Sequence, residues 1–463
     1  MRVLCVFHAG RNRPLRSRER ALAAAGVDLT FVVPDRWPEP GGELRLSHES
    51  FPVIELPVRR AGDLNRHLYR RGDIRRVILE VQPDLLDLHQ EPFNSVSHQW
   101  LANAPRELPV VMYSAQNVDK RFPPPFAWYE KRAFSRVGAF YPCSRQAASV
   151  LRGKGYDGRI DVIPLGYDPQ VFRPGAQSLD EDELRVMFVG RMVPEKGPLD
   201  ALQVAAALRR RRPCRLILCG EGPLQTEVRE CAARLGLRGR VEFLPWQSDA
   251  QLASLYARAH VVLVPSTWSC TWTEQFGRVI VEAQASGAVV AGYASGAIPE
   301  VGGAAALLAS PGDVAGLAEL TVRLLENRSE YAQRRSAGLR LSAERAWNAV
   351  AALQVEQYQS VLAGEAARHE LPRSPSRRRA VARAEFGPTA PLPGGRRPFA
   401  LPLLRRPGAL PRVLAAGIDA ASEARAQALR GSAWRQHLAV QPKDGIGGRP
   451  GAEVGCPGPR GRA

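Results

Sequence analysis

The sequence has few of the features that mark secreted, metal-bound or membrane-spanning proteins. Its seven cysteines are scattered among 463 residues, and they form neither a CxxC pair nor a Cys/His cluster with zinc-site spacing. No apolar run approaches about 18 residues, which excludes a membrane-spanning helix. Residues 1–8 already form a strand-like run and lack the apolar stretch and cleavage site of a signal peptide. We therefore expect a cytoplasmic protein with reduced thiols, and contact with the inner face of a membrane stays open.

Acidic residues are also scarce beside basic ones, since 46 Asp and Glu stand against 64 Lys and Arg, a net charge of +18. From Gly364 onward 18 Lys and Arg stand against 7 Asp and Glu, so this stretch carries about +11 of that total. It is rich in Pro, Gly and Arg, and only residues 414–429 could form a helix. We predict a mostly disordered basic tail over 364–463. Because the tail lacks interleaved aromatics and a nucleic-acid-binding motif, we expect no specific nucleic-acid partner.

The body of the chain alternates between strand-like and helix-like segments. In the first part we expect strands at 2–7, 28–33, 85–88, 110–113, 139–141 and 161–163. Helices are expected there at 16–25, 68–80, 126–134 and 145–154. Strands that alternate with helices are typical of βαβ units and a parallel sheet.

A second series of the same kind follows a Pro- and Gly-containing acidic interruption at 164–183. Its expected strands are 185–189, 215–219, 241–244, 261–264, 288–291 and 305–308. Its expected helices are 199–210, 224–235, 250–257, 277–286, 314–327, 330–341 and 343–362. The predicted α/β architecture is thus two doubly wound domains: 1–165, a linker at 166–183, 184–342, a last helix at 343–363, and the tail. Ligands of such sheets bind outside the carboxyl ends of the strands, so a shared ligand would lie in a cleft between the domains.

Two carboxylates, Glu274 and Glu282, stand eight positions apart around Gly277. Phe276 and Gly277 open the expected helix at 277–286, whose free N–H groups and dipole can stabilise an anion. Glu274 falls in the loop before this helix and Glu282 falls on it. Carboxylates accept hydrogen bonds from hydroxyl groups, so both can hold a sugar or a ribose.

A glycine and two cations follow the strand at 185–189. Arg191 can clamp phosphate oxygens with two hydrogen bonds, whereas Lys196 acts as a point charge, and Gly190 lets the backbone approach a ligand closely. The competing interpretation is a basic loop in solvent. Together with the two carboxylates, these cations predict a nucleotide-sugar site in which the leaving diphosphate is stabilised by preorganised donors.

Weaker signals extend this site. Gly220, Glu221 and Gly222 form a short glycine turn between a strand and a helix, as in many nucleotide sites, although a plain βα turn would look the same. Leu244 ends the next strand and could place its backbone against a nucleobase, whereas Trp246 is expected to be a packing residue.

The first domain offers its own candidates at strand ends. Gly10 and His8 follow the first strand, and His89 follows the strand at 85–88, so all three are candidates for the cleft. A purely structural role is open for each histidine.

These motifs resemble glycosyltransferase family 4, the retaining nucleotide-sugar transferases of the GT-B fold. The resemblance runs over residues 1–362 and is strongest over 186–300. Its matching stretches are 188–191 with 195–197, 220–223, 274–277 with 282–283, 287, 296–300, and 164–168 with 172–174. It implies two Rossmann-like domains facing a cleft, a last helix that crosses back to the first domain, and transfer without a metal or other cofactor.

The resemblance also implies roles for single residues. Arg191 and Lys196 would bind the donor diphosphate, Glu282 the ribose, and Glu274 the transferred sugar. Many family members carry a histidine after the strand at 110–113, where this chain has Gln116 and Asn117. Gln116 can donate a hydrogen bond to a sugar hydroxyl but cannot act as an acid or base near neutral pH.

The function that we expect is retaining transfer of a sugar, a hexose in the family's usual case, from a UDP- or GDP-sugar to a glycan or lipid-linked acceptor in polysaccharide assembly. Two alternatives stay open: an epimerase or phosphorylase of similar shape, and a nucleotide-sugar-binding scaffold without turnover. Asp180-Glu181-Asp182 matches the metal-binding DxD of another transferase fold, but its acidic linker context argues against a metal site. The helix at 126–134 mixes aromatic and basic residues, and could lie on an anionic bilayer or pack its aromatics on the sheet.

Overall fold

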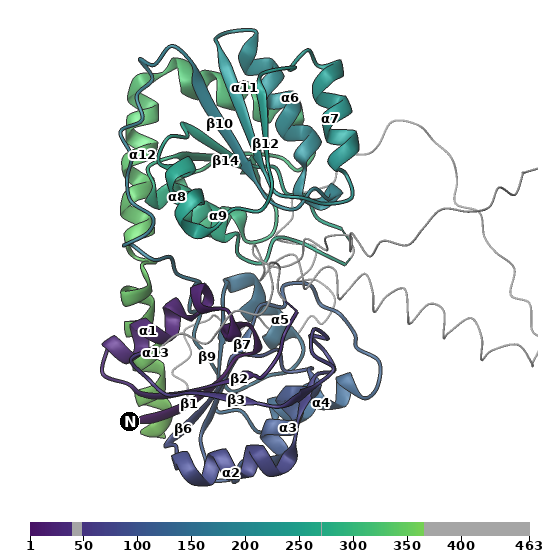
Figure 1. The fold of residues 1–463 in the computed structure, drawn as a ribbon, viewed down its shortest axis with the longest axis vertical. Helices are drawn as coiled ribbons and strands as arrows, with labels where there is room; N and C mark the ends of the chain where they lie inside the picture. Colours follow the sequence, from purple (N-terminus) through teal and green to yellow (C-terminus); the bar gives the residue numbers. More distant parts are fainter. Residues whose placement is uncertain (39–48, 270, 365–463) are drawn as a thin grey trace, which may run out of the picture.

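The computed structural model describes residues 1–38, 49–269 and 271–364 (Figure 1). Two lobes stand one above the other, the first domain in purple and blue and the second in teal and green (Figure 1). Each lobe is built on its own parallel sheet. Apart from Gly364, the predicted disordered tail and its helix at 414–429 lie outside the described residues.

The first domain holds a seven-stranded sheet in the order β3-β2-β1-β6-β7-β8-β9, with every neighbouring pair parallel. Its strands are β1 Arg2–Val6, β2 Asp28–Pro34, β3 Val53–Leu56, β6 Leu85–Leu88, β7 Val110–Ser114, β8 Ala139–Pro142 and β9 Arg159–Ile160. A small hairpin joins β4 Val58–Arg59 and β5 Leu68–Tyr69. The helices are η1 His8–Arg11, η2 Arg13–Arg16, α1 Ser17–Ala24, α2 Arg71–Val81, α3 Ser95–Asn103, α4 Phe126–Phe134 and α5 Arg145–Gly153.

The second domain holds a six-stranded parallel sheet in the order β12-β11-β10-β13-β14-β15, the strand order of a Rossmann-type sheet. Its strands are β10 Leu184–Val189, β11 Cys214–Cys219, β12 Val241–Leu244, β13 Val261–Val264, β14 Val289–Tyr293 and β15 Leu307–Ala309. The helices are η3 Pro194–Lys196, α6 Pro198–Arg209, α7 Gln225–Arg234, α8 Asp249–Tyr256, α9 Arg278–Ala285, α10 Ile298–Gly302, η4 Gly303–Ala305, α11 Val314–Glu326, α12 Arg328–Ala343 and α13 Trp347–Leu362.

Continuous apolar runs explain why these sheets are parallel and covered on both faces. All the residues of β7 and β13 are buried, which is the pattern of strands that have helices on both sides. The predicted class, two doubly wound α/β domains, is therefore confirmed. The domain limits given above stay a prediction.

Most predicted elements are confirmed, four of them with identical bounds: β6, β12, β13 and α4. The strand predicted at 161–163 is wrong, because β9 lies two residues earlier and pairs with β8. The helix predicted from residue 68 begins at Arg71, because residues 68–69 pair in β5. The strand β3 and the helices α3 and α10 were not predicted.

The last helix, α13, lies in the first domain beside α1 (Figure 1). A buried polar network joins the two helices to β6. The Arg18 guanidinium donates to Asp87 Oδ2 at 2.5 Å and to the Tyr358 hydroxyl oxygen at 3.1 Å. The Tyr358 hydroxyl also donates to Asp87 Oδ2 at 2.5 Å. Burial, together with the Asp87 charge, raises the pKa of Tyr358 well above its ordinary value, so this hydroxyl stays a donor.

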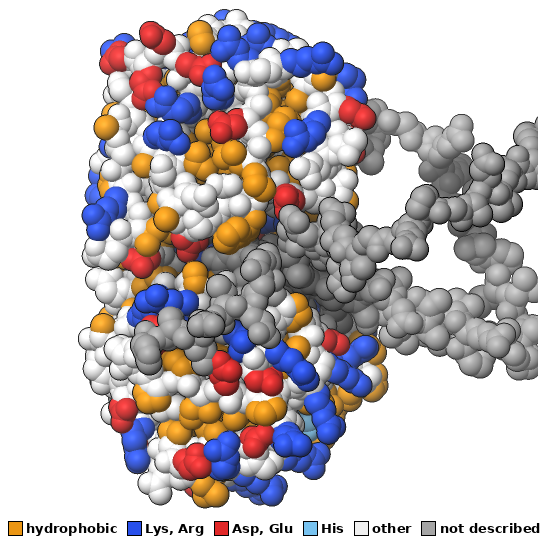
Figure 2. All heavy atoms as spheres, viewed as in Figure 1, with side chains coloured by type: hydrophobic (Ala, Val, Ile, Leu, Met, Phe, Trp, Pro, Cys, Tyr) orange, Lys and Arg blue, Asp and Glu red, His pale blue; other side chains and the backbone are white. Residues whose placement is uncertain are grey.

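On the face shown in Figure 2, Lys and Arg side chains gather along the top of the second domain and along one flank of the first, with Asp and Glu side chains among them. Within the described ranges, no helix combines the length and the apolar character needed to cross a bilayer.

Candidate active site

The two charges that the sequence singled out, 78 residues apart, meet at the carboxyl edge of the second sheet. Lys196, on the short turn η3 after β10, donates from Nζ to Glu274 Oε2 at 2.6 Å. Ser266 Oγ, just after β13, donates to the same oxygen at 3.2 Å. The side chains of Lys196 and Glu274 are 14% and 3% exposed, so the pair is largely removed from solvent. The Nζ also lies 5.0 Å from the ring centroid of Trp272.

Glycines in the neighbouring turns are required by close backbone contacts. A Cβ on Gly220 would lie 2.0 Å from the carbonyl oxygen of Gly190, and one on Gly222 would lie 2.6 Å from that of Met192. The Met192 N–H in turn donates to the Glu221 carbonyl at 2.9 Å. The turns after β10 and β11, which carry Arg191 and Glu221, therefore lie backbone against backbone.

The helix α9 begins directly after Gly277, whose φ of +80° suits glycine. The Phe276 side chain is 3% exposed and belongs to the hydrophobic core, so only its backbone is available to a ligand. Glu282 is fully buried, and its Oε1 lies 3.5 Å from Arg278 Nη2. The ribose contact predicted for Glu282 stays a prediction.

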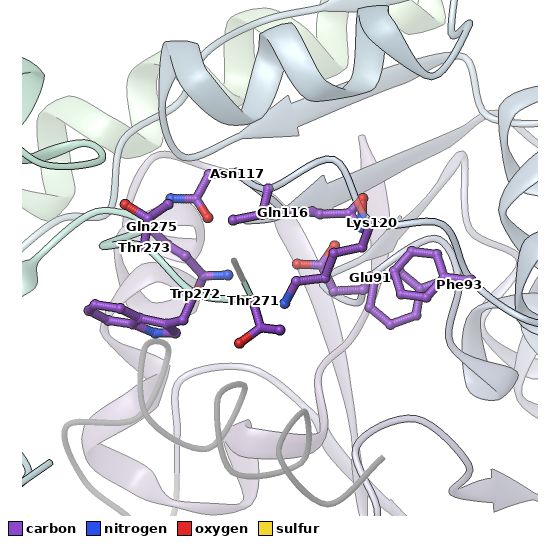
Figure 3. Close-up of a pocket in the computed structure, with 11 residues that line it drawn as sticks. Glu91, Phe93, Gln116, Asn117, Lys120, Thr271, Trp272, Thr273 and Gln275 are labelled. Carbon is purple, nitrogen blue, oxygen red and sulfur yellow. The ribbon is translucent and has the colours of Figure 1, made fainter. Parts of the chain in front are cut away.

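The first domain reaches the same place through the turn after β7. Asn117 Nδ2 donates to the backbone carbonyl of Glu274 at 2.8 Å, a hydrogen bond between the two domains. Gln116 is 7% exposed, and its Nε2 is a buried donor without a partner among the described residues. Both side chains line the pocket of Figure 3, which is about 30 Å³ and is formed by Glu91 and Lys120 from the first domain and by the 271–275 loop from the second.

A larger cavity of about 120 Å³ continues into the first domain. His89 lines it, with its ring stacked on Tyr113 at a centroid distance of 4.2 Å, and its Nδ1 lies 3.2 Å from the Tyr141 hydroxyl. Burial, and then the positive charge of Arg18, hold the His89 pKa well below its ordinary value. His89 is therefore neutral near pH 7 and can only exchange hydrogen bonds.

Two further candidates at the first strand have different surroundings. His8 lines the 120 Å³ cavity, and its Nδ1 lies 3.0 Å from Gln90 Oε1. A Cβ on Gly10 would lie 2.1 Å from the ring of Phe31, so packing requires a glycine there, and its predicted place in the cleft stays a prediction.

A third cavity, of about 140 Å³, lies beside the carboxyl end of β12 and is lined by Gly220 and Leu244. On the same wall, the Arg229 guanidinium lies over the Phe243 ring, 4.2 Å from the ring centroid. Trp246 is 44% exposed, so the prediction that it is a packing residue is wrong. Its position after the strand end leaves its ring on the surface.

The acidic side chains of the linker form ion pairs. Asp180 pairs with Arg328 and Glu181 pairs with Arg185. Over residues 1–38, 49–269 and 271–364 there is no group of three or more side chains suited to hold a metal ion.

Comparison with known proteins decides the family. Residues 16–171 match the model of the Glycosyltransferase Family 4 domain, and residues 173–340 match that of the glycosyl transferases group 1. The chain belongs to glycosyltransferase family 4. D-inositol 3-phosphate glycosyltransferases of Mycobacterium bovis and Mycobacterium tuberculosis are 40% identical to it over 168 residues. That alignment spans 33% of this chain and 33% of each relative.

Solved structures show that this family 4 chain has the GT-B fold. Sucrose-phosphate synthase from Thermosynechococcus elongatus covers 79% of the chain over its full length, with a TM-score of 0.62 and 21% identity. A glycosyltransferase from Rickettsia africae covers 78%, and 98% of its own length, with a TM-score of 0.61 and 17% identity. Anabaena HepE in complex with UDP-glucose covers 78% over its full length, with a TM-score of 0.57 and 19% identity.

The structure of this family 4 chain also reveals cleft residues that the motifs did not identify. Glu91 follows β6 two positions after His89 and lines both cleft pockets. Arg278, the first residue of α9, lines the 120 Å³ cavity from the second domain. The signal for Glu91 was available, because a carboxylate directly after a buried parallel strand lies at the ligand edge of the sheet.

Proposed function

We propose that this chain is a retaining glycosyltransferase that moves a sugar from a UDP- or GDP-sugar to a glycan or lipid-linked acceptor. The observation that carries the proposal is the Lys196–Glu274 pair, which lies at the carboxyl edge of the second sheet beside the start of α9. Anabaena HepE, which has the same fold, was solved with UDP-glucose, and this supports a nucleotide-sugar as the donor.

The arrangement supports separate roles for the cations and for the carboxylate at the donor. Arg191, Lys196 and the free N–H groups at the start of α9 are donors that would stabilise the charge that builds up on the departing diphosphate. When a diphosphate approaches Lys196, the ammonium gains a second anion and Glu274 becomes able to accept hydrogen bonds from the sugar. Because fixed cations and N–H groups supply this stabilisation, we expect transfer to proceed without a metal ion.

The acceptor would enter from the first domain. The 120 Å³ cavity combines apolar walls with hydrogen-bonding groups, including His89 and Gln90, as sites for small polar molecules often do. The neighbouring pocket of Figure 3 is lined by Gln116, whose Nε2 is a donor without a partner among the described residues, and by the 271–275 loop that carries Glu274. We propose that the leaving phosphate accepts the acceptor proton, because Gln116 cannot.

Peripheral membrane contact through α4 is a separate proposal. Trp128 is 52% exposed, with the Arg132 guanidinium 5.7 Å from its ring centroid. The Trp128 ring also lies 4.7 Å from His98 of α3, and the neighbouring Tyr129 stacks on the same His98 ring at 4.4 Å. Part of the aromatic face is thus used for packing, and co-sedimentation with anionic vesicles would check whether Trp128 reaches lipid.

The donor is tested by melting the protein with UDP, GDP and their sugars. A ligand that binds only the folded state raises the melting temperature by an amount that grows with its concentration. We expect a rise with one of the two nucleotide families, and release of that nucleoside diphosphate when an acceptor is added. Sugar interconversion or a requirement for inorganic phosphate would favour the epimerase or phosphorylase, and tight binding without turnover over many acceptors would favour the scaffold.

A further inference from the structure

Glu91 lies between the two cleft pockets. It follows β6, is 9% exposed, and lines both the pocket of Figure 3 and the 120 Å³ cavity. Its own backbone is fixed, because its carbonyl accepts the Ser97 hydroxyl at 2.7 Å and the Asn94 N–H at 3.1 Å. The carboxylate is therefore held at one position against the end of β7.

The carboxylate binds the turn that carries the cleft amides. Its Oε2 accepts from Ser114 Oγ at 3.0 Å, and its Oε1 accepts from the Ala115 N–H at 2.8 Å. Ser114 Oγ in turn accepts from the Gln116 N–H at 3.3 Å. The next side chain, Asn117, donates to the Glu274 carbonyl across the cleft. Hydrogen bonds to Ser114 and Gln116, the backbone from Gln116 to Asn117, and the Asn117 hydrogen bond thus connect Glu91 to the backbone of Glu274.

Both ionisation states of Glu91 are accessible near neutral pH. Burial raises its pKa to about 7, against the opposing effect of the hydrogen bonds from Ala115 and Ser114. A protonated carboxyl must donate from one oxygen, so the Ser114 hydroxyl would have to reverse or the Ala115 N–H would lose a full acceptor. After such a reversal, Ser114 Oγ would accept from both Glu91 and the Gln116 N–H, and its own hydroxyl proton would lose its buried acceptor, which weakens the turn that carries Gln116.

The charged groups nearest to Glu91 have opposite effects on its pKa, so neither of them sets that pKa alone. Glu130 and Lys154, behind the turn, form an ion pair of 2.8 Å, and their effects on the Glu91 pKa are of opposite sign. Lys120 points into the same pocket (Figure 3). On the cavity side, His8 and the neutral His89 line the wall.

The charged groups farther along that cavity wall are paired. Arg18 and Glu19 form an ion pair of 3.0 Å, and Arg278 lies 3.5 Å from the Glu282 carboxylate.

We propose that Glu91 is a positioning residue that holds the Ser114–Asn117 turn in its working geometry only as the carboxylate, so that transfer requires Glu91 to be ionised. This inference rests on the proposed glycosyltransferase function. The substitution Glu91→Gln fixes the hydrogen-bonding pattern of the protonated acid at every pH, because Gln accepts from the Ala115 N–H, can only donate to Ser114 Oγ, and does not titrate.

The test is the pH profile of kcat/KM for the wild type, Glu91→Gln and, as the matched control, Glu80→Gln, an exposed glutamate on α2. We expect wild-type and Glu80→Gln transfer to fall about tenfold per pH unit below about pH 7, as the ionised fraction falls. Glu91→Gln should lose this acid limb and transfer at every pH at the low rate of the acidic wild type, so a Glu91→Gln protein as active as the wild type at pH 8 would also overturn the proposal. An acid limb that is unchanged in Glu91→Gln would overturn the proposal.

A second variant tests the proposal independently, in case Glu91→Gln does not fold. Ser114→Ala removes a hydrogen bond that lowers the Glu91 pKa, so the acid limb should move to higher pH. An acid limb that stays in place would contradict the role of this contact.

The titration of Glu91 can also be read without any activity. Its folded pKa of about 7 lies above the ordinary 4.5, so its contribution to stability is full below pH 4.5 and is lost as the pH rises through 7. The melting temperature of the wild type, relative to Glu91→Gln, should fall over this window and level off above it. A constant difference would show that Glu91 does not titrate there and would overturn the proposal. Absence of transfer by the wild type at every pH would instead overturn the proposed function, and the positioning role with it.

Discussion

Replacing Lys196 by alanine should lower kcat for sugar transfer by about 100- to 1000-fold, the usual effect of losing one preorganised donor to a developing oxyanion. The Nζ donates a hydrogen bond from η3 to Glu274, and it is mostly buried beside the ring of Trp272. Its removal leaves the diphosphate one cation short and releases the sugar-side carboxylate. Steady-state kinetics with the donor found by melting would measure the loss.

The matched control for this loss is Arg323→Ala, which removes a cation from the exposed face of α11, far along the chain from the cleft. It should keep the wild-type kcat. Both variants should give the circular dichroism spectrum of the wild type, since Lys196 is not in a hydrophobic core cluster. A Lys196→Ala protein that is folded and fully active would refute the diphosphate role.

Replacing Arg18 by methionine should lower the free energy of unfolding by about 3–5 kcal/mol, the usual cost of leaving one partner of a buried ion pair alone. The Arg18 and Asp87 side chains are 6% and 0% exposed, and their contact of 2.5 Å lies between α1, β6 and α13. Without the guanidinium, Asp87 would keep two tyrosine donors but no cation. Denaturant unfolding would measure the change.

The exposed Arg76→Met variant provides the comparison, because its ion pair with Glu80 is in solvent and contributes at most about 1 kcal/mol. Tyr358→Phe should fall between the two, since it removes one hydrogen bond from the same carboxylate. An Arg18→Met protein as stable as Arg76→Met would mean that the Arg18–Asp87 pair does not stabilise the packing of α13 on the first domain.

Local sequence was enough to predict most of the strands that build the two sheets, but not β3 or the place of β9. Runs such as Val261–Val264 are apolar throughout and flanked by breakers, so their strand state and burial follow from the residues themselves. The cations after β10 and the acidic pair around Gly277 were likewise predictable, because strand ends and helix starts fix where such residues lie.

Contacts between distant segments could not be read from the sequence. The sequence around Glu91 does not indicate that its carboxylate accepts hydrogen bonds from residues 114 and 115. The register of β6 against β7 determines which residues lie beside that carboxylate. The Arg18 network forms only because α13, more than 330 residues farther along the chain, packs against the first domain. Trp246 was misjudged for the same reason: a tryptophan after a strand packs only if another element covers it, and none of the described elements does.

The central claim is that the turn after β10 and the start of α9 grip the diphosphate of a nucleotide-sugar. A crystal of the protein soaked with UDP or GDP tests this most directly. We predict the diphosphate within hydrogen-bonding distance of Arg191, Lys196 and the first N–H groups of α9, with the ribose toward Glu282. A nucleotide bound away from these groups would contradict the account.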